Sequence, residues 1–138
     1  MDQFNAVVAP QLDNIGGLNV TIPYKEQIIP YLDEVDQEAL KIGAVNTIKV
    51  LPEGKLRGYN TDVYGFEASL SKDLAPRHKS ALVLGTGGAS KAVAFVLDKL
   101  GLSYRFVSRN ESDQDVLSYA DLDEMIIQTH LVIVNCTP

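Results

Sequence analysis

The hydrophobic positions before about residue 60 form short segments separated by turn and capping residues. Apolar residues at 44–50 and 55–59 predict two strands that meet at the turn Pro52-Glu53-Gly54. Asp36 and Gly43 stand where they can cap the start and the end of a short helix. This pattern predicts a small lobe in which short helices accompany a β-hairpin.

Two more helices are expected around this hairpin. One begins at Ile22-Pro23-Tyr24-Lys25, with the proline in the first turn, where its missing N–H has the least effect. The other covers about 63–71 and follows the capping residues Asn60-Thr61-Asp62. Residues 74–79, which include Pro76, form the expected linker to the second part of the chain.

From residue 80 onward, buried strands alternate with helices. Ala81-Leu82-Val83-Leu84 is a continuous apolar run, typical of a strand that is buried on both faces, and two more strands are predicted at 104–108 and 131–135. Helices at about 90–100 and 121–127 separate these strands. The alternation predicts an α/β fold with a parallel sheet of three strands and right-handed crossovers.

Composition and charge narrow the possible functions. The 138 residues are 46% hydrophobic and carry a net charge of −6, so no general basic surface for nucleic acid is expected. The single cysteine, Cys136, cannot form an intramolecular disulfide and fits a reducing, cytoplasmic compartment. No apolar run is long enough to cross a membrane, and His78 and His130 have no partners at metal-ligand spacing.

A glycine-rich loop follows the first strand of the second part and opens a predicted helix. Its residues are Gly85, Thr86, Gly87, Gly88, Ala89 and Ser90. In a dinucleotide site the first glycine allows a tight turn, the second lets the backbone approach a pyrophosphate, and the third small residue lets the helix pack closely. The N–H groups at the helix start can hold an anion without a charged side chain. The loop therefore predicts a dinucleotide site, with a purely structural turn as the alternative.

The residues that end the second strand of this part favour NADP over NAD. An NAD site usually has Asp or Glu there to bind the ribose 2′-hydroxyl, whereas this chain has Ser108-Arg109-Asn110. The guanidinium of Arg109 could hold a 2′-phosphate bidentately; a solvated arginine is the alternative. An acid among Glu111, Asp113 and Asp115 could still serve a ribose.

Polar motifs in the first part are candidates for substrate chemistry. They lie at residues 19–25, 44–47 and 60–62, each beside an apolar element. Hydride transfer to a ketone needs a proton donor for the developing alkoxide, which Lys25 could supply with Asp62 as its partner. Thr21 and Asn46 are neutral donors and acceptors suited to a polyol. From spacing alone, a surface lysine and a helix-capping aspartate are the simpler interpretation.

The order of these motifs resembles the shikimate dehydrogenase family. That family carries the segments N-V-T-x-P-x-K, A-V-N-T, N-T-D-x-x-G-F and G-x-G-G-A, which stand here at 19–25, 44–47, 60–66 and 85–89. Residues 132–138 also resemble a later strand and the N-x-T-P turn of the family, which places Thr137 beside the cofactor. Four motifs in register make the resemblance specific.

The resemblance implies reversible, NADPH-dependent reduction of 3-dehydroshikimate to shikimate, a reaction of chorismate and aromatic amino-acid biosynthesis. Lys25 and Asp62 would be the catalytic pair, while Thr21, Asn46 and Asp62 would bind the substrate. The cofactor would contact the glycine loop, Ser108, Arg109 and Thr137. Residues 1–72 would then be a partial shikimate-binding lobe, and residues 73–138 a partial, truncated Rossmann-like NADP-binding lobe.

Two departures from the family pattern lead to further expectations. No Ser-x-Ser segment, which holds the substrate carboxylate in the family, precedes residue 16, and the family continues beyond the N-x-T-P turn. We therefore expect an internal piece that turns over 3-dehydroshikimate poorly and self-associates through an open sheet edge. The alternatives are a quinate/shikimate dehydrogenase that uses NAD, and a non-catalytic remnant that binds nucleotide or a partner.

Overall fold

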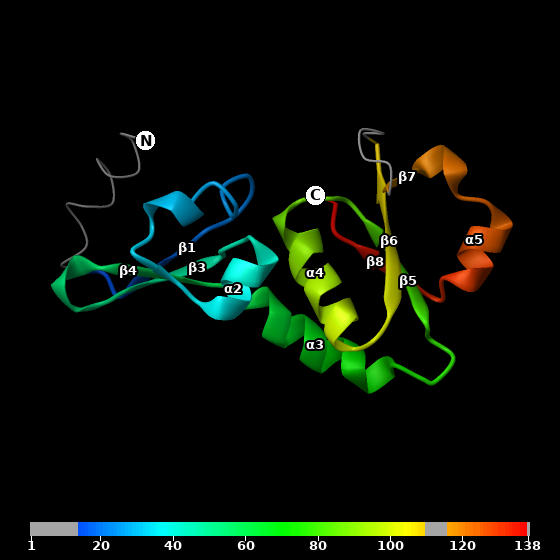
Figure 1. Cartoon of the computed structure of the whole chain (residues 1–138), viewed down its shortest axis with the longest axis horizontal. Helices are drawn as coiled ribbons and strands as arrows, with labels where there is room; N and C mark the ends of the chain where they lie inside the picture. The colour runs from blue at the N-terminus through cyan, green and yellow to red at the C-terminus, as the bar shows by residue number, and fades with distance from the viewer. Residues whose placement is uncertain (1–13, 110–115, 138) are drawn as a thin grey trace. The chain divides into compact units, whose positions relative to one another are not determined.

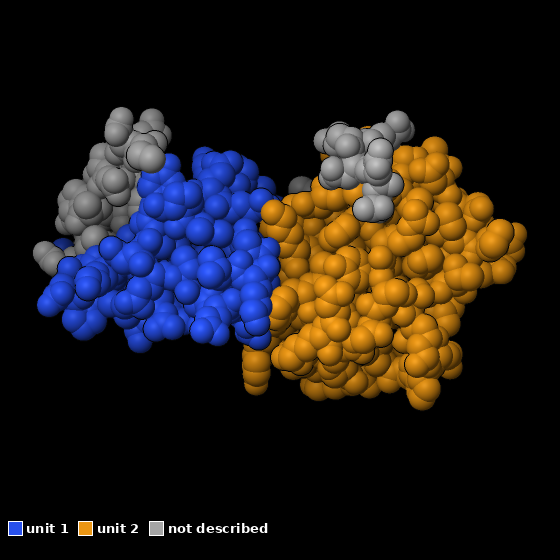
Figure 2. Space-filling view, viewed as in Figure 1, with its two compact units in different colours: residues 1–61 blue, residues 62–138 orange. Residues whose placement is uncertain are grey.

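The computed structural model describes residues 14–109 and 116–137, which fold in two compact units (Figure 1). Figure 2 shows these units, residues 1–61 and 62–138, in separate colours. The helix α3 (Asp62–Asp73) belongs to the second unit by its contacts, although the predicted boundary after residue 72 would place it in the first. The functional division into two lobes stays a prediction.

The first unit contains a mixed sheet with the strand order β1-β3-β4-β2 among the described residues. β3 (Thr47–Val50) and β4 (Leu56–Tyr59) form the expected antiparallel hairpin, joined by the short helix η3 (Pro52–Gly54). β1 (Gly17–Asn19) pairs antiparallel with β3, and β2 (Glu34–Val35) pairs parallel with β4. The sequence did not predict these two outer strands, because a segment of two or three residues is too short to show an alternation of apolar and polar positions.

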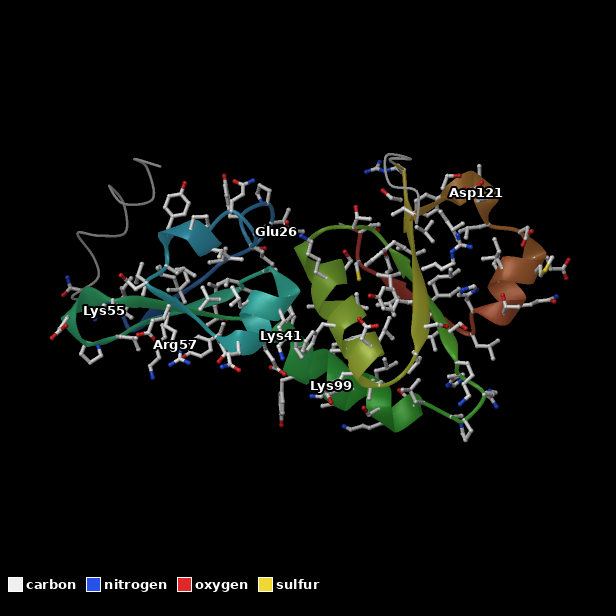
Figure 3. The ribbon with its side chains drawn as sticks, in the orientation of Figure 1. Glu26, Lys41, Lys55, Arg57, Lys99 and Asp121 are labelled. Carbon is white, nitrogen blue, oxygen red and sulfur yellow. The ribbon has the colours of Figure 1, made fainter. Side chains whose placement is uncertain are left out.

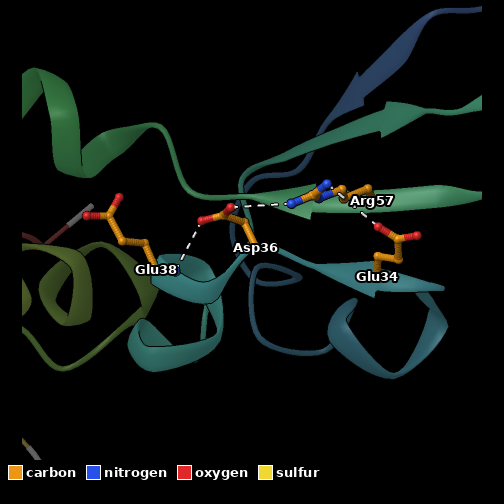
Figure 4. A network of polar contacts seen from close by, with 4 residues as sticks. All are labelled: Glu34, Asp36, Glu38 and Arg57. Carbon is orange, nitrogen blue, oxygen red and sulfur yellow. Dashed lines mark hydrogen bonds and ion pairs between the residues drawn. The ribbon is translucent and has the colours of Figure 1, made fainter.

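The helix α2 (Gln37–Ile42) begins and ends where the sequence predicts. The Asp36 carboxylate accepts a hydrogen bond from the Glu38 N–H at 3.1 Å, and Gly43, with φ of +71°, ends the helix. Arg57 on β4 lies 3.7 Å from both Asp36 and Glu34, so one guanidinium joins β2, β4 and the start of α2 (Figure 4).

The helix expected to begin at Ile22 is a wrong prediction. Residues 22–28 form turns, and only the short helix η2 (Ile29–Tyr31) follows them. The Lys25 carbonyl accepts from the Val45 N–H at 2.7 Å instead of from the N–H of Ile29, four residues later, which donates to Glu26. Pro30 has no N–H and cannot continue a helix beyond this point. The segment still contributes to the core, which consists of Ile28, Ala39, Val45, Ile48 and Leu56.

The second unit contains a wholly parallel sheet with the strand order β7-β6-β5-β8 among the described residues. β5 (Ser80–Leu84), β6 (Ser103–Ser108) and β8 (Val132–Asn135) confirm the three predicted strands. β7 (Val116–Ser118) is a fourth strand that the sequence did not predict, so the expected three-stranded sheet is too small. The predicted α/β class and Rossmann-like sheet are confirmed.

Helices cover both faces of this sheet. α3 and α4 (Gly88–Lys99) pack on one face, where Lys99 donates to Glu67 at 2.7 Å between the two helices (Figure 3). The short helix η4 (Tyr119–Asp121) leads towards α5 (Glu124–Thr129), and Ile126 of α5 packs on the other face. No helix of residues 14–109 or 116–137 is long and apolar enough to span a membrane.

The capping role of Asp36 can be separated from its ion pair with Arg57. Asp36→Ala should lower the free energy of unfolding by about 0.5–2 kcal/mol, because the N–H of Glu38 loses its acceptor. Asp36→Asn keeps a good capping residue and loses only a partly exposed ion pair whose atoms lie 3.7 Å apart, so its effect should stay below about 1 kcal/mol. Urea unfolding followed by circular dichroism measures both, and equal losses would contradict the capping role.

Candidate active site

The backbone of the first unit brings three predicted site residues into one cluster. The Val20 N–H donates to the carbonyl of Asn46 at 2.8 Å, and the Val45 N–H donates to the carbonyl of Lys25 at 2.7 Å. Thr21 directly follows Val20 and is exposed, while Lys25 and Asn46 are half-buried. We call Thr21, Lys25 and Asn46 the polar cluster.

The side-chain oxygen of Asn46 is hydrogen-bonded to two neighbouring threonines. Its Oδ1 accepts hydrogen bonds from the Thr47 hydroxyl at 3.0 Å, the Thr61 N–H at 3.0 Å and the Thr61 hydroxyl at 3.2 Å. Asn60, only 8% exposed, donates through its Nδ2 to the Ala44 carbonyl at 3.0 Å. The two Asn-Thr pairs of the sequence motifs therefore hold the segments 44–47 and 60–61 against each other.

Thr47 and Thr61 were not among the predicted site residues. Both stand directly after an asparagine, in Asn46-Thr47 and Asn60-Thr61. This repeated pair is the signal that sequence reasoning could have used, since a hydroxyl beside an amide can bond to it locally.

Asp62, the proposed partner of Lys25, directly follows Thr61 and is the first residue of α3. It is half-buried. An acidic side chain in the first turn of a helix also favours the helix through its dipole, so Asp62 has a structural role beside any catalytic one. Its pairing with Lys25 stays a prediction.

The glycine loop has the backbone that its sequence predicts. Gly85 has φ of +103°, a conformation that disfavours residues with a side chain. Its N–H donates to the Val107 carbonyl at 2.8 Å, and the Cys136 N–H donates to the Leu84 carbonyl, also at 2.8 Å. A Cβ on Gly85 would lie 3.2 Å from the Cys136 carbonyl oxygen and 3.4 Å from Cγ2 of Thr137. Gly85 therefore requires glycine for two separate reasons.

The start of α4 leaves room beside the loop. Gly87 is the N-cap of α4, and a Cβ built there meets nothing within 4 Å. The fully buried Ser90 donates through its hydroxyl to the Gly87 carbonyl at 2.6 Å. Thr86 is exposed, whereas Gly88 and Ala89 are half-buried. The small residues Gly87, Gly88 and Ala89 leave the main chain at the start of α4 accessible to a ligand.

The other predicted cofactor residues lie at the same edge of the sheet. β5, β6 and β8 run parallel, so their carboxyl ends are neighbours. The glycine loop follows β5, Ser108 ends β6 and Arg109 follows it, and Thr137 lies two residues after β8. Thr137 donates to Asn135 Oδ1 through its N–H at 3.0 Å and through its hydroxyl at 2.7 Å. We call this set the glycine-loop edge.

The surroundings of the glycine-loop edge add two observations. Burial raises the pKa of the Cys136 thiol, which keeps it protonated at neutral pH and unsuited to act as a nucleophile. Arg109 is exposed, and Ser108 is half-buried and pairs with Ser118 of β7. The acids considered for a ribose contact, Glu111, Asp113 and Asp115, lie outside the described residues, as does Asn110.

The candidate metal ligands are the His, Cys, Asp and Glu side chains of the described residues in both units. No group of three or more His, Cys, Asp or Glu side chains in residues 14–109 and 116–137 is placed to hold an ion. His78 instead accepts a hydrogen bond from the Ala75 N–H at 3.0 Å, and His130 contacts the Ile126 carbonyl at 2.8 Å. Both histidines thus have local structural contacts.

Comparison with known proteins gives a consistent picture. The shikimate dehydrogenase substrate binding domain matches residues 1–48. Shikimate dehydrogenase (NADP(+)) of Clostridium beijerinckii is 43% identical over 135 residues, which cover 93% of this chain and 50% of that protein. The protein of the same name from Halothermothrix orenii is 54% identical over 96 residues, covering 68% of this chain and 33% of that protein.

Solved structures show the same relationship. The crystal structure of shikimate dehydrogenase from Aquifex aeolicus superposes with a TM-score of 0.82 at 40% identity, covering 99% of this chain and 54% of that chain. The Thermus thermophilus enzyme in complex with NADP(H) and shikimate superposes with a TM-score of 0.73 at 32% identity, covering 99% of this chain and 54% of that chain.

The parallel sheet, with a glycine loop at its carboxyl edge, defines a Rossmann-like α/β protein. Within this class, the sequence and structure comparisons confirm the resemblance that the motifs predicted, and the chain belongs to the shikimate dehydrogenase family. The chain spans only between 33% and 50% of the length of these curated relatives.

Alanine substitutions at two loop glycines should have unequal effects on stability. Gly85→Ala should destabilise the chain by about 1–3 kcal/mol, because alanine is strained at this φ and its Cβ crowds the Cys136 carbonyl. Gly87→Ala has open space and an ordinary φ of −81°, so its cost should stay below about 1 kcal/mol, the loss of a favourable N-cap residue. Thermal and urea unfolding measure the loss of stability in each variant. A larger loss in Gly87→Ala than in Gly85→Ala would refute the loop geometry.

Proposed function

We propose that the chain forms part of an NADP-dependent oxidoreductase that reversibly reduces 3-dehydroshikimate to shikimate. The observation that carries this proposal is the glycine-loop edge, where Gly85 turns with φ of +103° beside Thr137. The names of the relatives, shikimate dehydrogenase (NADP(+)), support the same activity. Since the chain covers at most half of these relatives, the activity, substrate and cofactor belong to the proposal.

The glycine-loop edge fits a dinucleotide. The space beside Gly87 suits a pyrophosphate, and the N–H groups at the start of α4 supply positive potential in a protein with a net charge of −6. We assign Gly85, Thr86, Gly87, Gly88 and Ala89 to the pyrophosphate. Ser108, Arg109 and Thr137 complete the proposed site, with Arg109 holding the 2′-phosphate of NADP.

The polar cluster is the proposed substrate site. Bound NADPH would supply the hydride for the ring ketone. Lys25 donates the proton that the developing alkoxide needs, and Asp62 orients this lysine and binds a substrate hydroxyl. Thr21 and Asn46 hold further hydroxyl groups through neutral hydrogen bonds.

Two other functions remain as outcomes of the tests below. Quinate dehydrogenase from Corynebacterium glutamicum in complex with NAD superposes with a TM-score of 0.75 at 28% identity, which keeps an NAD-dependent activity on quinate or shikimate as the second candidate. This NAD-dependent activity is disfavoured because a serine, Ser108, stands where an NAD site usually has Asp or Glu. A non-catalytic remnant would bind nucleotide without oxidising NADPH in the presence of 3-dehydroshikimate.

The proposal extends to location and assembly. The single cysteine fits the reducing cytoplasm, where we place the protein. Self-association would use β8, which lies at the edge of the described sheet and exposes 55% of Ile133.

Replacing Arg109 tests the choice of cofactor. Arg109→Ala should weaken NADP binding by about 1.5–3 kcal/mol, as expected for a charged hydrogen bond, and leave NAD binding unchanged. Arg77→Ala, which removes another exposed arginine of the second unit, is the control and should change neither. Isothermal titration calorimetry with both cofactors measures the difference. Equal losses for NADP and NAD would exclude a 2′-phosphate contact.

Replacing Lys25 tests proton transfer. With the chain in excess over NADPH and 3-dehydroshikimate, Lys25→Ala should slow single-turnover oxidation of NADPH by about 10²–10⁴-fold and leave NADP affinity nearly unchanged. Lys41→Ala, at an exposed lysine of α2, should retain the wild-type rate. The maximal single-turnover rate of Lys25→Ala could instead stay within about threefold of wild type, while the chain concentration that gives half of this rate rises. Lys25 would then be a binding residue.

A further inference from the structure

The side-chain oxygen of Asn46 is occupied by the protein itself. The hydroxyls of Thr47 and Thr61 and the N–H of Thr61 all donate to Oδ1, at 3.0, 3.2 and 3.0 Å. An amide oxygen has two lone pairs, so three donors saturate it. The amide is therefore held with its oxygen towards the two threonines, and the group that it can offer to a ligand oxygen is Nδ2–H₂.

The fold holds both threonines at this oxygen. Thr47 begins β3 and pairs with Tyr59 at the end of β4, and the Asn46 N–H donates to the Tyr59 carbonyl at 3.0 Å. Thr61 follows β4 by two residues, so the hairpin brings its hydroxyl within 3.5 Å of the Thr47 hydroxyl. Two adjacent strand ends thus converge on one amide.

We propose that Thr61 and Thr47 are positioning residues that fix Asn46 as a hydrogen-bond donor towards the ligand. The inference rests on the proposed role of Asn46 in substrate binding. A carbonyl oxygen only accepts hydrogen bonds, whereas a hydroxyl both accepts and donates. An amide that donates can therefore bind both the ketone and the alcohol form of a substrate, while an amide turned the other way would bind only a hydroxyl.

An Asn46→Asp variant tests the polarity of this side chain. A carboxylate has nearly the same shape, and its oxygens accept from the threonine donors through stronger, charge-assisted bonds. The variant should therefore melt no lower than wild type but bind shikimate about tenfold more weakly, because it cannot donate. Ligand-observed NMR, which detects weak binding, measures the affinity. Unchanged or tighter shikimate binding by Asn46→Asp would overturn the proposal.

Thr61 variants test the positioning step. Thr61→Val keeps the shape and the N–H but removes the hydroxyl, and should weaken shikimate binding about fivefold, as for the loss of one neutral hydrogen bond. Thr61→Ser keeps the hydroxyl and should bind like wild type. Thr129→Val removes a hydroxyl from α5 in the second unit, and should also bind like wild type. A Thr61→Val variant that binds like Thr61→Ser would contradict the positioning role.

The side-chain amide resonances of Asn46 test the positioning role of Thr61 without any ligand, and so independently of the proposed function. In ¹⁵N–¹H spectra these resonances should move in Thr61→Val and stay in place in Thr61→Ser. If wild type does not bind shikimate, the substrate role of the polar cluster fails, and the resonances still decide whether Thr61 positions Asn46. Resonances that are identical in wild type and Thr61→Val would overturn the positioning role whatever the ligand result.

Discussion

The left-handed turn at Gly85 is the constraint on which the second unit depends. β5 ends at Leu84, and the chain turns at Gly85 into the loop before α4. The Gly85 N–H donates to the Val107 carbonyl of β6, and the Leu84 carbonyl accepts from the Cys136 N–H, directly after β8. A Cβ on Gly85 would lie 3.2 Å from the Cys136 carbonyl oxygen, a contact tight enough to strain any other residue at this positive φ. This turn leads to the start of α4, whose N–H groups are the ones proposed to hold a pyrophosphate.

The first unit has a comparable centre at Asn46. Its backbone and side chain together bond to segments that are far apart in the sequence, at Val20, Tyr59 and Thr61. The exposed Thr21 and the half-buried Lys25 lie on the segment held by these bonds. The polar groups proposed to bind substrate are thus carried by a hydrogen-bonded frame, and this frame restricts how they move.

Much of the fold could be predicted because its signals are local. The apolar run at 81–84, the helix between Asp36 and Gly43 and the glycine loop each have a distinct pattern, and the structure contains all three. The short strands β1, β2 and β7 could not be predicted, since they exist through pairing with distant strands. The helix expected from Ile22 does not form because the Lys25 carbonyl bonds to the distant Val45 N–H, a contact that local sequence does not reveal.

The candidate site shows the same division between local and distant signals. The positions of Gly85, Ser90 and Thr137 at one sheet edge follow from the topology of a parallel sheet. The contact of Thr61 with Asn46 joins residues of different motifs, and only the folded hairpin reveals it. The pairing of Lys25 with Asp62 is implied by the family resemblance alone and stays a prediction.

An NMR titration of the ¹⁵N-labelled chain tests the central claim, that two separate ligand sites exist, most directly. NADP⁺ added alone should move the backbone amide signals of residues 85–89, 108–109 and 137. Shikimate added alone should move those of residues 21, 25, 46, 61 and 62 instead. Saturable shifts confined to these two groups would support the account. No shifts at millimolar ligand, or shifts centred elsewhere, would contradict it.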